Sequence, residues 1–221
     1  MDKTKQAVDV FNKLANLYTE KYMNVDLYAD SLDIFCELME NNGSVLELAC
    51  GPGNVTKYIL DKRPDLKILG TDLAPNMLDI ARERNPNAVF MLMDCREIYK
   101  LNKTYDAVVC AFGSPYLSKD ESLKMIADTS KILDTNGLFY LSFMEDENSR
   151  SGTQKGSTGD EIFMNFHEEG YIVEALEKNR FTMVDLRRKT YAGPDAKPVT
   201  DLLILTKLGG KPAREPFLGT K

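Results

Sequence analysis

Apolar residues in the first forty positions recur at the spacing of amphipathic helices. In residues 3–22 the side chains on one helical face are Ala7, Val10, Phe11, Leu14 and Tyr18. Residues three and four positions apart share a helical face, and residues 26–40 repeat the pattern. We therefore expect two helices before the first strand, forming a helical N-terminal cover over residues 1–43.

From residue 44 onward, short apolar runs alternate with helical segments. The runs that predict strands are residues 44–48, 67–72, 88–93, 105–112 and 138–143, followed by 180–190 and 201–207. Pro75 suits the first turn of one intervening helix, and Ser118 with Glu121 fits a capping box for another. Such alternation predicts an α/β core with a parallel sheet and helices on both faces, which we place at residues 44–207.

Residues 145–161 differ from the rest of the core because they are polar, rich in glycine and without periodicity. Long segments of this kind in compact domains are usually lids or disordered loops. We expect a loop over 145–161, within a lid-like insertion that spans 145–170, and a helix near 168–178. Glycine and proline between 193 and 198 predict a turn, and residues 208–221 are expected to form a C-terminal tail.

The most informative stretch is Val-Leu-Glu-Leu-Ala-Cys-Gly-Pro-Gly-Asn at residues 45–54. An apolar strand leads into small residues that let the backbone turn tightly and approach a ligand. Glu47 lies near the carboxyl end of this strand, where open α/β sheets bind ligands. A carboxylate there argues against a phosphate ligand and for a positively charged one, most plausibly S-adenosylmethionine.

The same stretch separates two classes of cofactor. It matches acid-x-Gly-x-Gly-x-Gly, the first motif of the class I methyltransferases, with Ala49 in place of the first glycine. The dinucleotide fingerprint Gly-x-Gly-x-x-Gly needs a third glycine after Gly51 and Gly53, but Thr56 occupies that position. The pattern therefore favours S-adenosylmethionine over a nicotinamide cofactor, although a glycine pair alone also occurs in ordinary tight turns.

Acidic residues also end the second and third predicted strands. Asp72 can accept hydrogen bonds from both hydroxyls of a ribose, with Leu73 and Met77 on either side of the adenine. Its alternative role is to cap the helix that follows. Asp94 with Cys95 can read the adenine amino group, and the alternative is a solvated strand end.

The fourth predicted strand ends at Ala111 and Phe112, whose backbone would face the amino-acid end of the cofactor. Some amino-methyltransferases carry Asn/Asp-Pro-Pro-Tyr/Phe next. Residues 113–116 are instead Gly-Ser-Pro-Tyr, without the amide or acid and without the first proline. We therefore do not expect methylation of DNA adenine or of glutamine.

Taken in order over residues 44–207, these motifs resemble the class I S-adenosylmethionine-dependent methyltransferases, in their broad small-molecule branch. The resemblance implies a Rossmann-like three-layer sandwich with a mostly parallel seven-stranded sheet and an antiparallel last strand. It also implies that two tyrosines of the first helix close over the cofactor, although they could equally pack that helix. The residues expected to bind S-adenosylmethionine are Tyr18, Tyr22, Glu47, Ala49, Gly51, Gly53, Asn54, Asp72, Leu73, Met77, Asp94, Cys95, Ala111 and Phe112.

Candidate catalytic residues are few. In-line alignment of nucleophile, methyl group and sulfur, with water excluded, can supply much of the acceleration. His167 is the only histidine and titrates near neutrality, so it is a candidate general base, with a structural role as the alternative. Tyr116 and Tyr191 are further candidates on the acceptor side.

Composition narrows the partners. A net charge of −6 and a pI near 5.0 argue against a nucleic-acid substrate, which normally requires a basic face. Four cysteines without metal-ligand spacing, and no apolar run long enough to span a membrane, indicate a cytoplasmic protein without a metal. We expect methyl transfer to a small-molecule acceptor by a monomer or homodimer. The alternatives are an RNA or protein methyltransferase, a non-catalytic S-adenosylmethionine-binding protein and a nicotinamide oxidoreductase.

Overall fold

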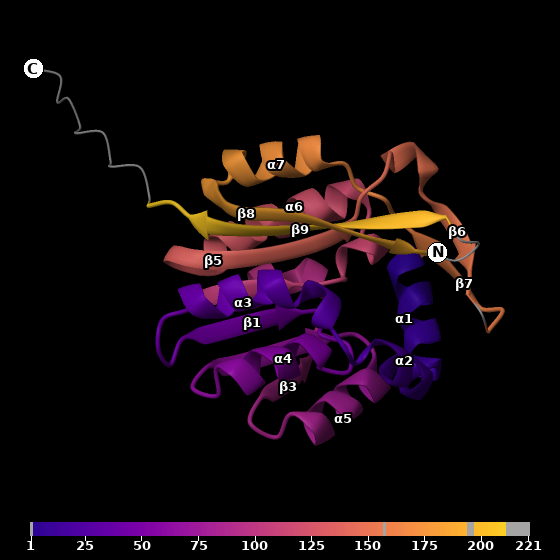
Figure 1. Cartoon of the computed structure of the whole chain (residues 1–221), viewed down its shortest axis with the longest axis horizontal. Coiled ribbons are helices and arrows are strands. Elements are labelled where there is room, and N and C mark those ends of the chain that lie inside the picture. Colours follow the sequence, from indigo (N-terminus) through magenta and orange to yellow (C-terminus); the bar gives the residue numbers. More distant parts are fainter. Residues whose placement is uncertain (1, 157, 194–196, 211–221) are drawn as a thin grey trace, which may run out of the picture.

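The computed structural model describes residues 2–156, 158–193 and 197–210, and its centre is a seven-stranded sheet (Figure 1). The strands are β1 (Ser44–Leu48), β2 (Lys67–Asp72), β3 (Val89–Leu92), β4 (Tyr105–Cys110), β5 (Leu133–Met144), β8 (Phe181–Ala192) and β9 (Pro198–Leu208). Their order across the sheet is β3-β2-β1-β4-β5-β9-β8. The fifth strand thus begins earlier than the expected residue 138.

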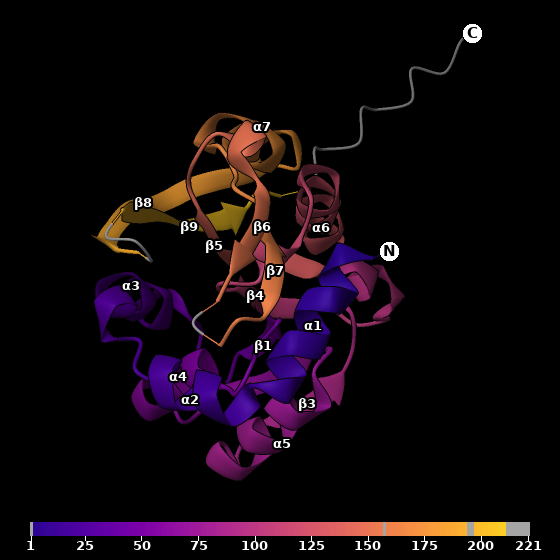
Figure 2. The ribbon, with the colours of Figure 1, turned by 90° about the vertical axis from the view of Figure 1, so that its right-hand side faces the viewer.

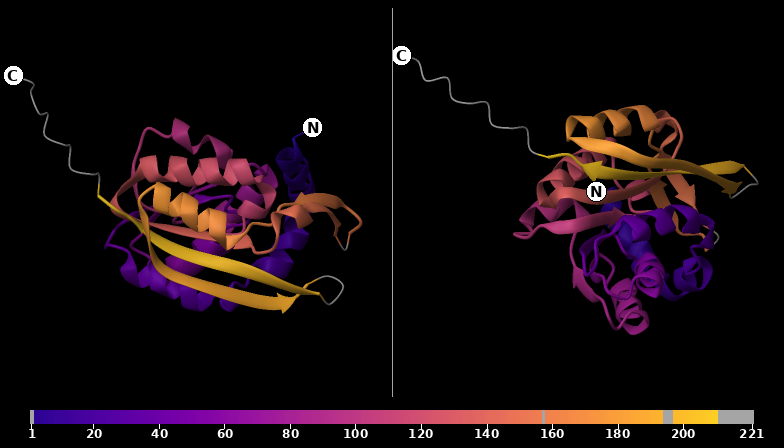
Figure 3. Two further views of the ribbon diagram at one scale, coloured as in Figure 1. Left: turned by 90° about the horizontal axis from the view of Figure 1, so that it is seen from above. Right: turned by 60° about the vertical axis from the view of Figure 1, so that its left-hand side comes forward.

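Strand direction follows the expected plan. β1 pairs in parallel with β2 and β4, β2 with β3, and β4 with β5. β9 runs antiparallel between β5 and β8, and the β8–β9 hairpin forms one side of the sheet (Figure 3). The α/β class and the antiparallel last strand are confirmed. The carboxyl ends of the parallel strands lie at one edge, where such sheets bind ligands.

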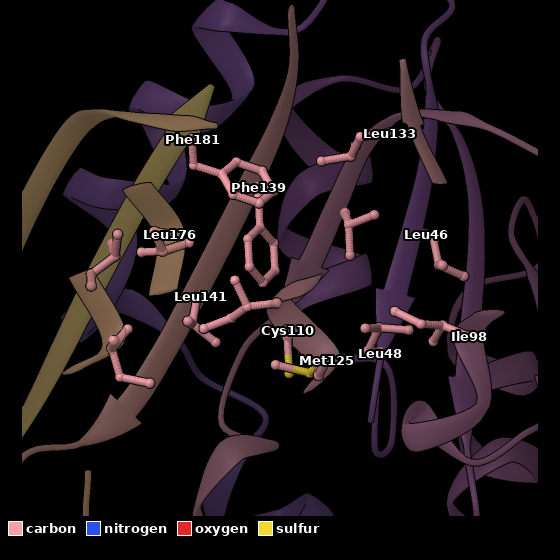
Figure 4. Close-up of a cluster of buried hydrophobic side chains, with 14 of the residues drawn as sticks. Leu46, Leu48, Ile98, Cys110, Met125, Leu133, Phe139, Leu141, Leu176 and Phe181 are labelled. Carbon is pink, nitrogen blue, oxygen red and sulfur yellow. The ribbon is translucent and has the colours of Figure 1, made fainter. Parts of the chain in front are cut away.

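Helices cover both faces of this sheet. They are α3 (Ala29–Leu38), α4 (Asn54–Lys62), α5 (Pro75–Arg84), α6 (Lys119–Ile132) and α7 (Glu169–Lys178). Because strand side chains alternate between faces, Leu46 and Leu141 pack with α6 and α7 (Figure 4). Val45 and Val109 point the other way, toward α3 and α4. The three-layer sandwich is therefore confirmed.

The N-terminal helix is interrupted where the sequence predicts continuity. Two helices, α1 (Lys3–Lys13) and α2 (Ala15–Tyr22), flank Leu14, whose ψ of 18° is not helical. The side-chain oxygen and backbone carbonyl of Asn12 both accept hydrogen bonds from Asn76 at the start of α5. This tertiary contact competes with continuation of the helix, and the local apolar pattern does not encode it.

The expectation of a loop over residues 145–161 is wrong. A single turn, η4 (Asn148–Arg150), leads into β6 (Gly152–Lys155), which pairs antiparallel with β7 (Glu161–Met164). The polar sequence hides this hairpin because most of its side chains remain exposed to solvent. The contacts that hold this hairpin come from another part of the chain.

That partner is α1, which lies beside the β6–β7 hairpin (Figure 2). The ammonium group of Lys3 lies 3.3 Å from the centre of the Phe163 ring, and Lys13 forms an ion pair with Asp160 at 2.8 Å. The backbone N–H of Asn165 also donates to the carbonyl of Pro115. These contacts join the β6–β7 hairpin to α1 and to the segment that follows β4.

Short 3-10 turns complete the described chain. They are η1 (Asp26–Tyr28), η2 (Cys95–Lys100) and η3 (Ser114–Tyr116). Residues 194–196 of the expected turn and residues 211–221 of the expected tail lie outside the described residues. The division into cover, core and tail stays a prediction.

Candidate active site

The turn between β1 and α4 holds three alternate residues in the left-handed region. Their φ angles are 51° at Ala49, 53° at Gly51 and 75° at Gly53. Glycine adopts this conformation freely, whereas a residue with a Cβ atom loses about 1–2 kcal/mol. The tight turn therefore explains the glycines, and Ala49 carries strain that a glycine would not.

A cavity of about 770 Å³, including its open side, lies against this turn. The predicted residues that line it are Tyr18, Ala49, Gly51, Asn54, Asp72, Leu73, Met77, Cys95, Ala111 and Phe112. They come from α2, the turn after β1, the end of β2, the start of α5, η2 and the end of β4. Convergence of strand ends at one edge brings these separate segments together.

The carboxylate of Asp72 is partly buried in the wall of this first cavity. One oxygen accepts the backbone N–H of Gly51 and the other accepts that of Ala74, both at 2.8 Å. Burial raises the pKa of Asp72. The hydrogen bond to Ala74, the N-cap of α5, realises part of the alternative capping role. Each oxygen keeps a further lone pair that is free to accept a hydrogen bond from a ribose hydroxyl. Ribose binding itself stays a prediction.

Glu47 does not line either cavity described here. Its side chain is buried under the turn, where the hydroxyl of Thr56 donates to it. Burial raises the pKa of Glu47 to about 8. Thr56 therefore provides the buried acid with its partner, at the position where a dinucleotide-binding turn would carry glycine. Direct contact of Glu47 with a cofactor is an expectation that the geometry does not support.

Asp94 is also absent from the first cavity's wall, where its neighbours Met93 and Cys95 lie. Both of its oxygens accept from the guanidinium of Arg96, and it caps η2 through the Arg96 N–H. The expected contact with adenine therefore competes with this ion pair. Arg96 bonds Glu121 and Asp2 as well, which fixes the start of α1.

Gly53 and Tyr22 have positions other than those expected. Gly53 packs against α5 instead of lining the first cavity: a Cβ atom there would lie 2.5 Å from Nδ2 of Asn85. Tyr22 lines a second cavity, together with Tyr18, whose ring centroid is 4.7 Å away. The Tyr22 carbonyl accepts from Asn54. Closure of the two tyrosines over a cofactor stays a prediction.

The second cavity adjoins the first and has a volume of about 1300 Å³, including its open side. Both cavities are lined by Phe11, Tyr18, Asn54, Phe112 and Tyr116. The β6–β7 hairpin contributes Gln154, Lys155, Ile162 and Met164, and β9 contributes Asp201. Two cavities that share a wall have the geometry to hold the two reactants of a group transfer side by side.

Of the three candidate catalytic residues, two line a cavity and one does not. Tyr116 lines both cavities and Tyr191 lines the second. His167 lines neither and is fully buried, with ring nitrogens 2.5 Å from the Tyr171 hydroxyl and 3.0 Å from the Ser114 carbonyl. Burial lowers its pKa. His167 as a general base is therefore not supported, because the core packing of α7 withholds it from both cavities.

Sequence reasoning missed two parts of the site. Helix α1 supplies Thr4, Ala7 and Val8 to the first cavity, with the Thr4 hydroxyl donating to the carbonyl of Tyr116 at 2.8 Å. The apolar face of α1 predicts that this helix packs against another segment, but it does not indicate which one. Asp201 gave a signal that could have been used, since an acid inside an otherwise apolar strand is unusual unless it is paired.

Residues 45–137 match a family model described as a methyltransferase domain. Together with the strand order, this match confirms the expected resemblance: the chain has the class I S-adenosylmethionine-dependent methyltransferase fold. The described residues contain no group of three or more His, Cys, Asp or Glu able to hold a metal. Nor does this described part of the chain include a helix with the length and apolarity to cross a membrane.

Curated relatives and solved structures agree with this fold. The malonyl-(acyl-carrier protein) O-methyltransferase of Acetivibrio thermocellus is 40% identical over 67 residues, 29% of this chain and 23% of that protein. The demethylmenaquinone methyltransferase of Thermotoga maritima is 24% identical over 68% of this chain and 67% of its own length. The magnesium protoporphyrin IX methyltransferase of Synechocystis, with S-adenosylmethionine bound, has a TM-score of 0.68 at 16% identity, covering 95% of this chain and 98% of that one. The chain thus spans under a quarter of the first of these relatives.

Proposed function

We propose that this chain is a methyltransferase that transfers a methyl group from S-adenosylmethionine to a small-molecule acceptor. The observation that carries the proposal is the first cavity, which the left-handed turn and Asp72 line at the carboxyl edge of the sheet. The family match covers the same segment. The names of the relatives support methyl transfer but leave the acceptor open.

The residues of the first cavity fit this cofactor. A Cβ atom placed on Gly51 would meet no atom within 4 Å, so the turn leaves free space beside the backbone. Met77, Leu73 and Cys95 provide an apolar surface of the kind that an adenine ring occupies. Asp72 would accept hydrogen bonds from the ribose, while Glu47, paired with Thr56, would support the turn from beneath.

S-adenosylmethionine, when bound, supplies an activated methyl group on a sulfonium. The chain's part is to align the acceptor and exclude water. Phe112 stands on the wall shared by the two cavities and holds a left-handed φ of 62°. Its N–H donates to Ser142 at 2.9 Å, and its ring centroid lies 4.6 Å from that of Tyr28. Strain of this kind persists where the surroundings enforce it, and it often marks a functional site.

The free thiols Cys36, Cys50, Cys95 and Cys110 suit a reducing compartment, so the proposal includes a cytoplasmic location. The second cavity, with its apolar lining, is proposed to hold the acceptor. Binding of the cofactor can be tested directly, without knowledge of the acceptor.

The test is calorimetric titration of the purified protein with S-adenosylmethionine, S-adenosylhomocysteine and NADH. We expect the two adenosyl ligands to bind and NADH not to bind. Binding of NADH alone, or of none of the three, would overturn the proposal. Binding of both adenosyl ligands with methyl transfer to RNA or protein but not to small metabolites would indicate a macromolecular acceptor, and binding without transfer to any of these would indicate a non-catalytic binding protein.

A further inference from the structure

A buried carboxylate without a cationic partner lies in the wall of the second cavity. Asp201 on β9 is 3% exposed. Its two oxygens accept from the hydroxyl of Tyr28 at 2.7 Å and from that of Tyr191 at 3.5 Å. Among the described residues, those two hydroxyls are its side-chain partners, and no lysine or arginine forms an ion pair with it.

Such an arrangement is costly without a ligand. Two neutral hydroxyls satisfy hydrogen bonds of a carboxylate but do not balance its charge, and an unbalanced buried charge is strongly disfavoured. Burial accordingly raises the pKa of Asp201. A cation that entered the cavity would relieve this penalty, whereas an anion would increase it.

The rest of the cavity wall is also suited to a cation with an apolar body. Aromatic rings from Tyr18, Tyr22, Phe112 and Phe143 surround the space, and the faces of such rings attract ammonium groups. Among the described residues that line it, Lys155 is the one other with a formal charge, and it lies on the exposed β6 strand. Positive charge is therefore at the outer hairpin and negative charge at the buried wall.

We infer that the acceptor carries an amino group on an apolar body, and that the carboxylate of Asp201 pairs with this group in its protonated form. Because a protonated nitrogen has no lone pair, methyl transfer to that nitrogen requires its proton to pass first to the carboxylate. Asp201 is thus a specificity-determining residue. Phe112 lies on the wall shared by the two cavities, and its ring packs against Tyr28, the hydrogen-bond partner of Asp201. The inference rests on the proposed function, because it assigns the second cavity to the acceptor.

A purely structural role for Asp201 is the competing explanation, since the carboxylate also joins η1 to β8 and β9. Asp201→Asn separates the two. The amide oxygen still accepts from Tyr28, which preserves the link, but the negative charge is lost. Asp134→Asn is the matched control, because Asp134 is an exposed acid at the opposite, amino-terminal start of β5.

The experiment compares three probes of similar size in calorimetry, with the protein saturated by S-adenosylhomocysteine: phenethylamine, 2-phenylethanol and 3-phenylpropionate. We expect the amine to bind about tenfold or more tighter than the alcohol and the acid, the gain typical of a charged hydrogen bond. Asp201→Asn should abolish this preference, and Asp134→Asn should retain it. Equal affinities, preference for the acid, or an amine preference that survives in Asp201→Asn would each overturn the inference.

The outcomes separate this inference from the proposed function. If S-adenosylhomocysteine binds but the amine does not bind at millimolar concentration, the acceptor class is wrong and the cofactor assignment stands. If S-adenosylhomocysteine itself does not bind the wild-type protein, the proposed function fails. Retained S-adenosylhomocysteine affinity in Asp201→Asn shows that the variant is folded.

Discussion

Ala49 and Gly113 face each other where the turn after β1 meets the end of β4. A Cβ atom on Gly113 would lie 2.8 Å from the Cβ atom of Ala49, which is closer than side-chain carbons normally approach. Gly113 has an ordinary φ of −85°, so lack of space and not backbone conformation demands a glycine there; after Ala49, the next atom is Sγ of Cys110 at 3.2 Å. The methyl group of Ala49, at a position where the motif usually has glycine, is therefore the nearest group that excludes a side chain at residue 113.

This relationship predicts a coupled pair of substitutions. Gly113→Ala should lower the free energy of unfolding by about 1–3 kcal/mol through overpacking. Ala49→Gly should raise it by about 1 kcal/mol by removing backbone strain, and the double variant should recover most of the loss. Urea denaturation of the four proteins measures the coupling. Strictly additive effects would show that the two residues do not compete for the same space.

Asp72 should contribute both to the affinity for the cofactor and to the stability of the turn after β1. Asp72→Ala is expected to weaken S-adenosylhomocysteine binding by about tenfold or more, the cost of losing charged hydrogen bonds. Calorimetry with the 2′-deoxyribose analogue distinguishes the roles. The analogue should bind wild type more weakly than the parent ligand, and the two should bind Asp72→Ala alike. An undiminished effect of the missing hydroxyl in the variant would leave Asp72 with its capping role only.

Arg96 should control access to the first cavity. Its guanidinium is 18% exposed and joins Asp2, at the start of α1, to Asp94 and Glu121. Arg96→Met should release α1 from the cavity and speed dissociation of S-adenosylhomocysteine several-fold. Stopped-flow displacement measures this rate, and Arg82→Met, which removes an exposed ion pair with Asp79, is the control. Equal rates in all three proteins would exclude this role.

Glu47 should make stability depend on pH. Its pKa is about 8 in the fold, above its ordinary value of 4.5. The folded state therefore keeps a proton that the unfolded state releases. The stabilisation that this proton gives the fold is complete below pH 4.5 and is lost as the pH rises toward 8. Between pH 4.5 and 8 the wild-type protein should lose on the order of a few kcal/mol of its free energy of unfolding, and Glu47→Gln should not show this loss. Denaturant unfolding at pH 5.5 and 8.5 tests this, with the exposed Glu83→Gln as control. A parallel decline in both variants would refute it.

His167 should support the fold and not the chemistry. Its pKa is lowered from 6.5 by burial, so the folded state resists protonation and stability falls as the pH drops below 6.5. His167→Gln should cost about 1–3 kcal/mol, because the Tyr171 hydroxyl and Ser114 carbonyl lose a well-placed partner. Affinity for S-adenosylhomocysteine should be unchanged. A large loss of affinity in a folded variant would return His167 to the site.

Local patterns predicted much of the framework. The capping box of Ser118 and Glu121 starts α6 as expected, because both partners lie within one helical turn. The turn at residues 49–53 was equally readable, since its conformation depends on the residues within it. Local patterns did not predict the break at Leu14 or the β6–β7 hairpin, whose contacts come from distant segments.

The sequence by itself determined the order of the seven strands of the main sheet and of the helices between them, the glycine turn and the acid at the end of β2, because each depends on neighbours within a few residues. Only the tertiary structure decided which acids line the cavities. Asp94 is held by Arg96 and Glu47 by Thr56, whereas Asp201 lies in the wall of the second cavity between Tyr28 and Tyr191. Whether a carboxylate faces a ligand or a neighbouring side chain depends on how sheet and helices pack, and that packing joins residues far apart in the chain.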